Sequence, residues 1–206
     1  MFYYLSFLIW FPIILGCTFF FFRTYVSFIK IVSFISTFFC FILSLFLIYK
    51  YSLLHTHQLV FQEKFSFVPF LGIYYYLALD CLSAPLLFLN CFITFLVIIY
   101  SFNERHKNIS YYYILFLIME GFINGVFCSL DAIFFYIFFE AMLIPMFLII
   151  GIWGGHNRIY ATLKFFLYTF FGSIFLLISI IYIHKLSLEQ GIFVDKSFFL
   201  PSFYNL

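Results

Sequence analysis

The chain is a series of long apolar runs separated by short polar or charged segments. Each run approaches the ~20 residues that a helix needs to cross the roughly 30 Å hydrocarbon layer of a bilayer. The pattern therefore predicts an all-α integral membrane protein, a single membrane domain over residues 1–206. The six predicted spans lie at about residues 2–22, 27–49, 82–101, 110–127, 131–153 and 161–183.

Two polar stretches are predicted to lie outside the membrane. Residues 50–76 form the only sizeable polar connection and are predicted to be an extramembrane loop, while residues 184–206 form a polar tail without another span. Asp131 stands at the start of the fifth span. A carboxylate at that position accepts hydrogen bonds from free helical N–H groups, so we expect Asp131 to cap this helix.

The basic residues favour an N-terminus on the outside of the membrane. In that orientation six basic residues lie at inner ends and four at outer ends, a small excess of the kind that sets topology. The inner residues would be Arg23, Lys30, Arg105, Lys107, Arg158 and Lys164, and the outer ones Lys50, Lys64, Lys185 and Lys196.

Composition narrows the class of protein. Hydrophobic residues make up 67% of the 206 residues and charged residues 9%, too few to cover the surface of a soluble domain. No basic cluster indicates nucleic acid, and no glycine-rich loop indicates a nucleotide. The five cysteines lack metal-type spacing and are interpreted as small packing residues. The 38 phenylalanines indicate an AT-rich gene of the kind that organelles carry.

Two carboxylates stand isolated within apolar segments, Glu120 and Glu140. Each is ten residues from Leu130 at the intervening turn, which places both about 15 Å deep, near the middle of the membrane. Inserting a charged residue there costs about 2.5–3.5 kcal/mol, so such residues usually face a partner or a water-filled path. If the two acids face each other, they cannot both ionise cheaply, and the pair is a candidate proton relay.

Alternatives to the relay remain open at this stage. The sequence does not fix the rotation of either helix, and both acids can instead be hydrogen-bonded ties between helices. Gly121, Asn124 and Gly125 would suit a close helix contact around Glu120. Lys164 can partner a buried acid, but a lysine one turn from an interface more often extends to water.

Several segments together resemble subunit 4 of respiratory complex I, the proton-pumping NADH:ubiquinone oxidoreductase. They are the run from Phe135 to Met146 around Glu140, Ile150 to Gly154, Lys164 to Ser173, and an upstream pair, Leu71 to Tyr74 with Leu79 to Pro85. The resemblance covers about residues 67–183 and implies an antiporter-like subunit of the membrane arm.

The resemblance implies roles for single residues. Glu140 would be the key acid of a proton channel, Glu120 has a counterpart in many relatives, and Lys164 has one in only some. Cys81 stands where a glycine is usual, a change that we expect to be tolerated. No cofactor is expected in this chain, because flavin and iron–sulfur clusters would lie on other subunits.

The resemblance also implies partners and a location. The family has about fourteen helices in two inverted halves, and the seventh-helix lysine that pairs with the glutamate lies beyond these six. We therefore expect a split subunit with a separate C-terminal half, beside other antiporter-like subunits and lipids of the mitochondrial inner membrane, and no nucleic acid. The alternatives are a subunit of a multisubunit cation/proton antiporter and a non-pumping structural remnant.

Overall fold

The computed structural model describes residues 3–54, 59–68, 70, 72–102, 108–189 and 198. Within these residues, six helices are long and apolar enough to cross a membrane, which confirms the predicted fold class. The elements in chain order are α1 (Tyr4–Phe21), α2 (Val26–Leu54), β1 (Val60–Val68), β2 (Ile73–Leu79), α3 (Ser83–Ser101), α4 (Ile109–Cys128), α5 (Ala132–Trp153) and α6 (Arg158–Glu189).

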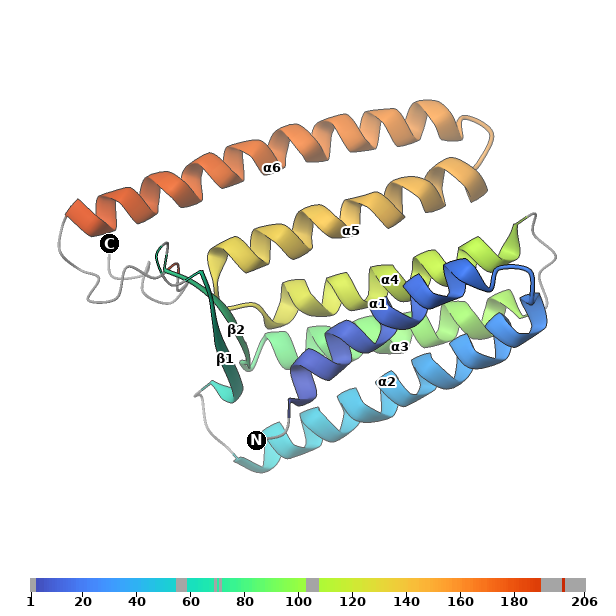
Figure 1. Ribbon diagram of the computed structural model, residues 1–206, viewed down its shortest axis with the longest axis horizontal. Helices are drawn as coiled ribbons and strands as arrows, with labels where there is room; N and C mark the ends of the chain where they lie inside the picture. The colour runs from blue at the N-terminus through green and yellow to red at the C-terminus, as the bar shows by residue number, and fades with distance from the viewer. Residues whose placement is uncertain are drawn as a thin grey trace.

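The helices lie side by side along one long axis (Figure 1). The last turns of α1, α3 and α5 and the first turns of α2, α4 and α6 lie at one end of the bundle, here called the turn end, and the two strands lie at the other, the hairpin end. Helix α4 is central, because it packs against α1, α2, α3 and α5. Half of its span is buried, against 11% for α6, which packs on α5 at the edge of the bundle.

The connection between α2 and α3 contains an antiparallel hairpin that the hydrophobic pattern did not predict. Strands β1 and β2 pair with Lys64 opposite Tyr76, and the register shifts near both ends of β1. Gly72, just before β2, has a positive φ of 69°, a conformation that favours glycine. The expected loop over 50–76 is therefore partly helical, since α2 extends to Leu54, and partly β-structure, while residues 55–58 lie outside the described residues.

The expected polar tail begins as helix. Helix α6 continues to Glu189, beyond the predicted end of its span at 183, because polar residues there do not interrupt a helix that has left the hydrocarbon layer. Of the rest of the tail, only Phe198 is described, and its ring stacks on His184 at 3.8 Å between ring centroids.

Two carboxylates attach the hairpin to helix starts. Glu63 on β1 is 3% exposed and accepts hydrogen bonds from the backbone N–H of Leu5 at 2.9 Å and of Ser6 at 3.0 Å. Asp131 caps α5 as predicted, with Oδ1 accepting from the N–H of Ile133 at 3.0 Å and of Phe134 at 3.2 Å. Its second oxygen, Oδ2, accepts from the N–H of Tyr74 on β2 at 3.0 Å. The hairpin thus joins α1 to α5.

Candidate functional site

Glu120 lies in the centre of the bundle. Its side chain is fully buried, and neither carboxyl oxygen has a hydrogen-bond partner among the described residues. The thiols of Cys40 on α2 and Cys91 on α3 are close enough to interact with it electrostatically. Cys91 is at best a weak donor, so the carboxyl lies in an interface of α2, α3 and α4 that leaves it without a strong partner.

An amide cluster lies one turn from Glu120 towards the hairpin end. Asn90 on α3 donates to Asn124 Oδ1 at 2.8 Å and to the backbone oxygen of Glu120 at 3.3 Å. Asn124 in turn donates to the backbone oxygen of Leu8 on α1 at 3.2 Å. These bonds fix the rotation of α4 relative to α1 and α3.

Glu140 lies on the face of α5 that packs against α6. On that face the rings of Phe147 and Phe166 are 5.3 Å apart, and Thr162 lies 3.6 Å from where a Cβ on Gly151 would be. Glu140 is seven residues before Phe147, and therefore on the same side of the helix. Continuing this antiparallel register brings Glu140 opposite Ser173, which is 2% exposed. The Glu140 side chain is half-buried, and its Oε2 is buried without a hydrogen-bond partner among the described residues.

The facing pair that the sequence allowed is not formed. On α4, Ile118 and Phe122 line a groove shared with α5, and Glu120 is two positions from each, on the opposite side of the helix. On α5, Phe138 contacts the Gly125 position of α4, and Glu140 is two positions further on. The two carboxyls are at similar depth but point away from each other, on opposite sides of the α4–α5 contact.

Lys164 lies on the outer face of α6 and meets neither acid. Its side chain is exposed, with Nζ 5.8 Å from the ring centre of Tyr160 and 6.0 Å from that of Tyr168. Thr162 and Phe166, which contact α5, are two residues to either side and therefore on the opposite face of α6. The structure does not bring the three candidate site residues together.

A groove of about 510 Å³ runs between α1, α4 and α5 on the side away from both acids. Pro145 is buried in its wall, within a helix that is continuous from Ala132 to Trp153. Its described lining is almost wholly apolar, which is suited to packing rather than to proton transfer.

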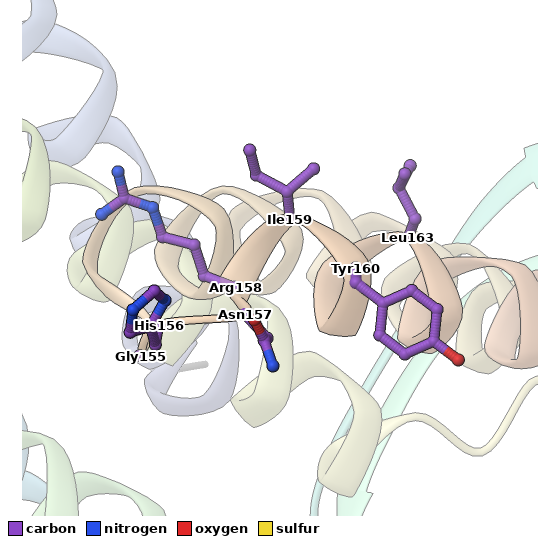
Figure 2. Close-up of a pocket in the computed structure, with 7 residues that line it drawn as sticks. All are labelled: Gly155, His156, Asn157, Arg158, Ile159, Tyr160 and Leu163. Carbon is purple, nitrogen blue, oxygen red and sulfur yellow. The ribbon is translucent and has the colours of Figure 1, made fainter.

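The α5–α6 turn forms a shallow pocket of about 660 Å³ at the turn end (Figure 2). Figure 2 shows His156 and Arg158 beside the turn, with Tyr160 and Leu163 further along α6. Arg158 Nη1 donates to the backbone oxygen of Ile152 at 2.9 Å and so satisfies a carbonyl at the C-terminus of α5. Over the described part of the chain, no group of His, Cys, Asp and Glu side chains is arranged to hold a metal ion.

Sequence reasoning missed the surroundings of Glu120. It interpreted Cys40 and Cys91 as packing residues and did not single out Ser33, Ser36 or Tyr113. The available signal was the recurrence of small polar residues every three or four positions in α2, which places them on one face of that helix. The members of this series are Ser33, Ser36, Thr37, Cys40 and Ser44.

Comparison with known proteins identifies relatives for most of the chain. A family model described as NADH:quinone oxidoreductase/Mrp antiporter, TM, matches residues 129–193, which include Glu140 and Lys164. The NADH-quinone oxidoreductase subunit M of Rickettsia typhi is 40% identical over 159 residues, covering 77% of this chain and 32% of the relative. The NADH-ubiquinone oxidoreductase chain 4 of Marchantia polymorpha is 42% identical over 129 residues, covering 62% and 26%.

The fold agrees with these relatives. A chain in a solved structure of respiratory complex I from Thermus thermophilus with bound NADH matches with a TM-score of 0.76 and 27% identity, covering 98% of this chain and 39% of that chain. The chain thus spans about a third or less of the length of these curated relatives.

Proposed function

Because this chain belongs to the family of antiporter-like membrane subunits found in NADH:quinone oxidoreductases and Mrp antiporters, we propose that it takes part in proton translocation as a membrane-arm subunit of an NADH:ubiquinone oxidoreductase. The observation that carries the proposal is Glu140. Its carboxyl lies about 12 Å along α5 with one oxygen buried and unpartnered among the described residues, inside the segment that the family model matches. An acid at that depth costs insertion energy, which favours a functional role.

Glu140 would act by binding and releasing one proton. A cation brought against the α5–α6 face would favour release of the proton, and its withdrawal would favour rebinding. We assign the main role to Glu140 and a secondary one to Glu120. Lys164 would take part only if a further helix covered the outer face of α6.

The cation would come from outside this sequence. We propose that a separate C-terminal half of the subunit supplies a lysine at membrane depth, since the chain spans about a third or less of its relatives. Neighbouring antiporter-like subunits and membrane lipids would cover the remaining apolar surface. The flavin and iron–sulfur clusters that oxidise NADH and reduce quinone would lie on other subunits, so this chain would contribute to the enzyme only as a subunit.

We propose the mitochondrial inner membrane as the location. The phenylalanine-rich composition, typical of AT-rich organelle genes, and the similarity to the Marchantia chain 4 support it. The test is gentle purification of the membrane assembly and identification of its polypeptides by mass spectrometry. A separate polypeptide carrying the further helices, found with NADH-oxidising subunits, would support a split subunit. A complete assembly without such a polypeptide would contradict it.

The role of Glu140 is tested with Glu140→Gln, which keeps the volume and removes the exchangeable acid proton. We expect an assembled complex that still oxidises NADH but moves fewer protons per NADH, by about the share of one antiporter-like subunit. Proton uptake and NADH oxidation would be measured together in sealed vesicles. Ile144→Val, at an exposed position of the same helix, is the control. Normal pumping by an assembled Glu140→Gln complex would overturn the assignment.

A second candidate is a subunit of a multisubunit cation/proton antiporter, because the description of the matched family includes Mrp antiporters. The two candidates differ in the proteins that should co-purify with this chain. Co-purification with flavin and iron–sulfur proteins supports the oxidoreductase, whereas an assembly without redox proteins that exchanges cations for protons supports the antiporter.

A further inference from the structure

The interface of α2, α3 and α4 carries a row of buried polar side chains, here called the polar interface. On α2 five small polar residues are buried, and each is 2% exposed or less: Ser33, Ser36, Thr37, Cys40 and Ser44. On α4 the row contains Tyr113, Glu120 and Asn124, and α3 adds Cys91, Thr94 and Ser101, all buried. An ordinary membrane-helix contact is made of apolar and small residues, so this density of polar groups calls for a physical account.

Several polar atoms of this row lack hydrogen-bond partners. Ser33 Oγ, Ser36 Oγ, Tyr113 Oη and both oxygens of Glu120 are buried without one among the described residues. Neighbouring hydroxyls do find partners in their own helix, for example Thr37 Oγ1, which donates to the oxygen of Ser33 at 3.0 Å. Among the described residues, the only other buried side-chain nitrogen or oxygen without a hydrogen-bond partner is Glu140 Oε2. Buried polar groups are normally hydrogen-bonded, to ordered water when no protein group is available.

The unpartnered atoms form a sequence along the bundle axis. Helices α2 and α4 run in the same direction, from the turn end to the hairpin end (Figure 1). Cys40 on α2 and Glu120 on α4 lie within electrostatic range of each other, and Ile29 packs in one cluster with Tyr113 and Leu117, so residues of α2 and α4 about 80 positions apart lie at similar levels of the bundle. Seven residues towards the turn end from Cys40 and Glu120 lie Ser33 and Tyr113, which is about 10 Å along the axis.

The row reaches the turn end of the bundle. Tyr113 is in the first turns of α4, and the neighbour of its hydroxyl is the hydroxyl of Ser101, the last residue of α3. The Ser101 hydroxyl donates to the backbone oxygen of Ile98 at 2.8 Å, so the contact with Tyr113 is at best a weak hydrogen bond.

Leu117 is fully buried between Tyr113 and Glu120 on α4. By the same register of α2 and α4, the buried hydroxyls of Ser36 and Thr37 on α2 lie at the level of this gap, Ser36 on the side of α2 that also borders α1.

We propose that the polar interface holds a short row of water molecules that connects Glu120 with the turn end through Ser36, Ser33 and Tyr113. Glu120 exchanges its proton by this route, on the opposite side of α4 from Glu140. In each exchange the Glu120 O–H bond breaks as a water oxygen accepts the proton, and a proton from the row then bonds to the carboxylate. No net charge moves, and the proposal does not depend on whether Glu140 pumps protons.

The test measures how fast Glu120 exchanges hydrogen for deuterium in the purified membrane assembly. Difference infrared spectroscopy reports the C=O stretch of a protonated carboxyl, and the band lost in Glu120→Gln identifies this residue. We expect exchange to slow by about tenfold or more in Ser36→Val, which replaces the bridging hydroxyl with a methyl group, and in Tyr113→Phe. Tyr113→Phe keeps the ring and removes only the hydroxyl. It therefore tests whether these hydroxyls carry the exchange even if the Ser36→Val protein does not assemble.

Two matched controls substitute exposed residues at the turn end. Ser27→Val on α2 and Tyr25→Phe should leave the exchange rate of Glu120 unchanged. Glu140→Gln should also leave it unchanged, whatever its effect on pumping, which separates this proposal from the proposed function. Equal exchange rates in all variants, or the absence of a band from protonated Glu120, would overturn the proposal.

A high-resolution map of the complex gives an independent readout. Water density within hydrogen-bond distance of Ser33, Ser36 and Tyr113 is the expected result. A dry interface in which these hydroxyls bond only to backbone carbonyls of their own helices would contradict the proposal.

Discussion

The carboxylate of Asp131 is shared between two elements, since one oxygen accepts from the first turn of α5 and the other from β2. The sequence predicted the first role, because an aspartate before an apolar helix is a common N-cap. It did not predict the second, because Tyr74 is 57 residues away in the chain and only the folded hairpin brings its N–H to Asp131. Hydrogen bonds between residues close together in the sequence were thus predictable, whereas those between residues far apart in the sequence were not.

Removing this carboxylate should destabilise the protein. Asp131→Ala loses the cap and the bond to Tyr74, and we expect a cost of about 1–2 kcal/mol, at or above that of an ordinary N-cap. Asp131→Asn keeps one oxygen acceptor for the cap and should cost less. Thermal unfolding of the two variants in the same detergent measures the difference. Equal stability of Asp131→Ala and the unsubstituted protein would show that the cap contributes nothing.

The ionisation of Asp131 makes the stability of the folded protein depend on pH. Burial raises the pKa of Asp131 above its ordinary value of 3.8, outweighing the hydrogen bonds from Tyr74, Phe134 and Ile133. The folded protein then binds this proton more tightly than the unfolded chain, so the stabilisation is complete below the ordinary pKa and is lost as pH rises through the folded one. Relative to Asp131→Asn, which does not titrate, the protein should become less stable as the pH rises above about 4. A constant difference would contradict a raised pKa.

At the scale of elements, the contact between α1 and α4 depends on two glycines, Gly16 and Gly121. Because neither has a side chain, the two helices can approach closely there. A Cβ on Gly121 would lie 2.5 Å from the backbone oxygen of Ile9 and from Cγ1 of Ile13, and one on Gly16 would lie 2.6 Å from Ile118. The backbones of the two helices therefore approach closely, which helps to hold Glu120 in its position facing α2 and α3. Asn124, bonded to α1 and α3, holds the same rotation.

Gly121→Ala should therefore separate α1 from α4. Because the atom it meets is backbone, the helices must shift, and we expect a loss of about 1–3 kcal/mol, the usual range for overpacking. The control is Gly172→Ala on α6, where nothing lies within 4 Å of the added Cβ. Thermal unfolding compares the two, and equal melting temperatures would contradict the close approach.

The elements themselves were predictable to different degrees. Apolar length alone located the helices, because only about 20 residues of such composition fit a bilayer. The hairpin was missed because β1 has polar residues on both faces and β2 is apolar nearly throughout, so neither shows a clean alternation. Its stability comes instead from Glu63 bonding to α1 and from Asp131. The opposed directions of Glu120 and Glu140 depend on helix rotation, which the apolar pattern does not specify.

At the scale of the whole molecule, burial is unevenly distributed. Helix α4 is enclosed by four helices, whereas α6 contacts α5 and has a broad apolar face exposed. In a bilayer such a face is compatible with lipid or with another helix. The proposed place of this chain beside other membrane subunits predicts a helix.

The exposed face of α6 should therefore touch other protein in the assembled complex. A photo-crosslinking amino acid at Leu167, which is 52% exposed, should capture a neighbouring polypeptide. The same amino acid at Ser179, an exposed residue on the part of α6 nearer the hairpin end, tests how far the contact extends, and Thr162, 3% exposed and facing α5, is the control that should give no crosslink to another chain. Crosslinks from Leu167 to lipid alone would show that lipid covers this face.

The hydrogen bonds from Glu63 to α1 have a consequence for the synthesis of the protein. The first turn of α1 emerges from the ribosome 57 residues or more before its capping carboxylate. Until α2 has crossed the membrane in the reverse direction, Glu63 cannot reach the same side as Leu5, and the amide groups there depend on water or lipid headgroups. These bonds therefore form only when both helices have inserted with the correct topology. A chain whose second helix failed to cross would leave its first helix uncapped, a difference that quality-control proteases can detect.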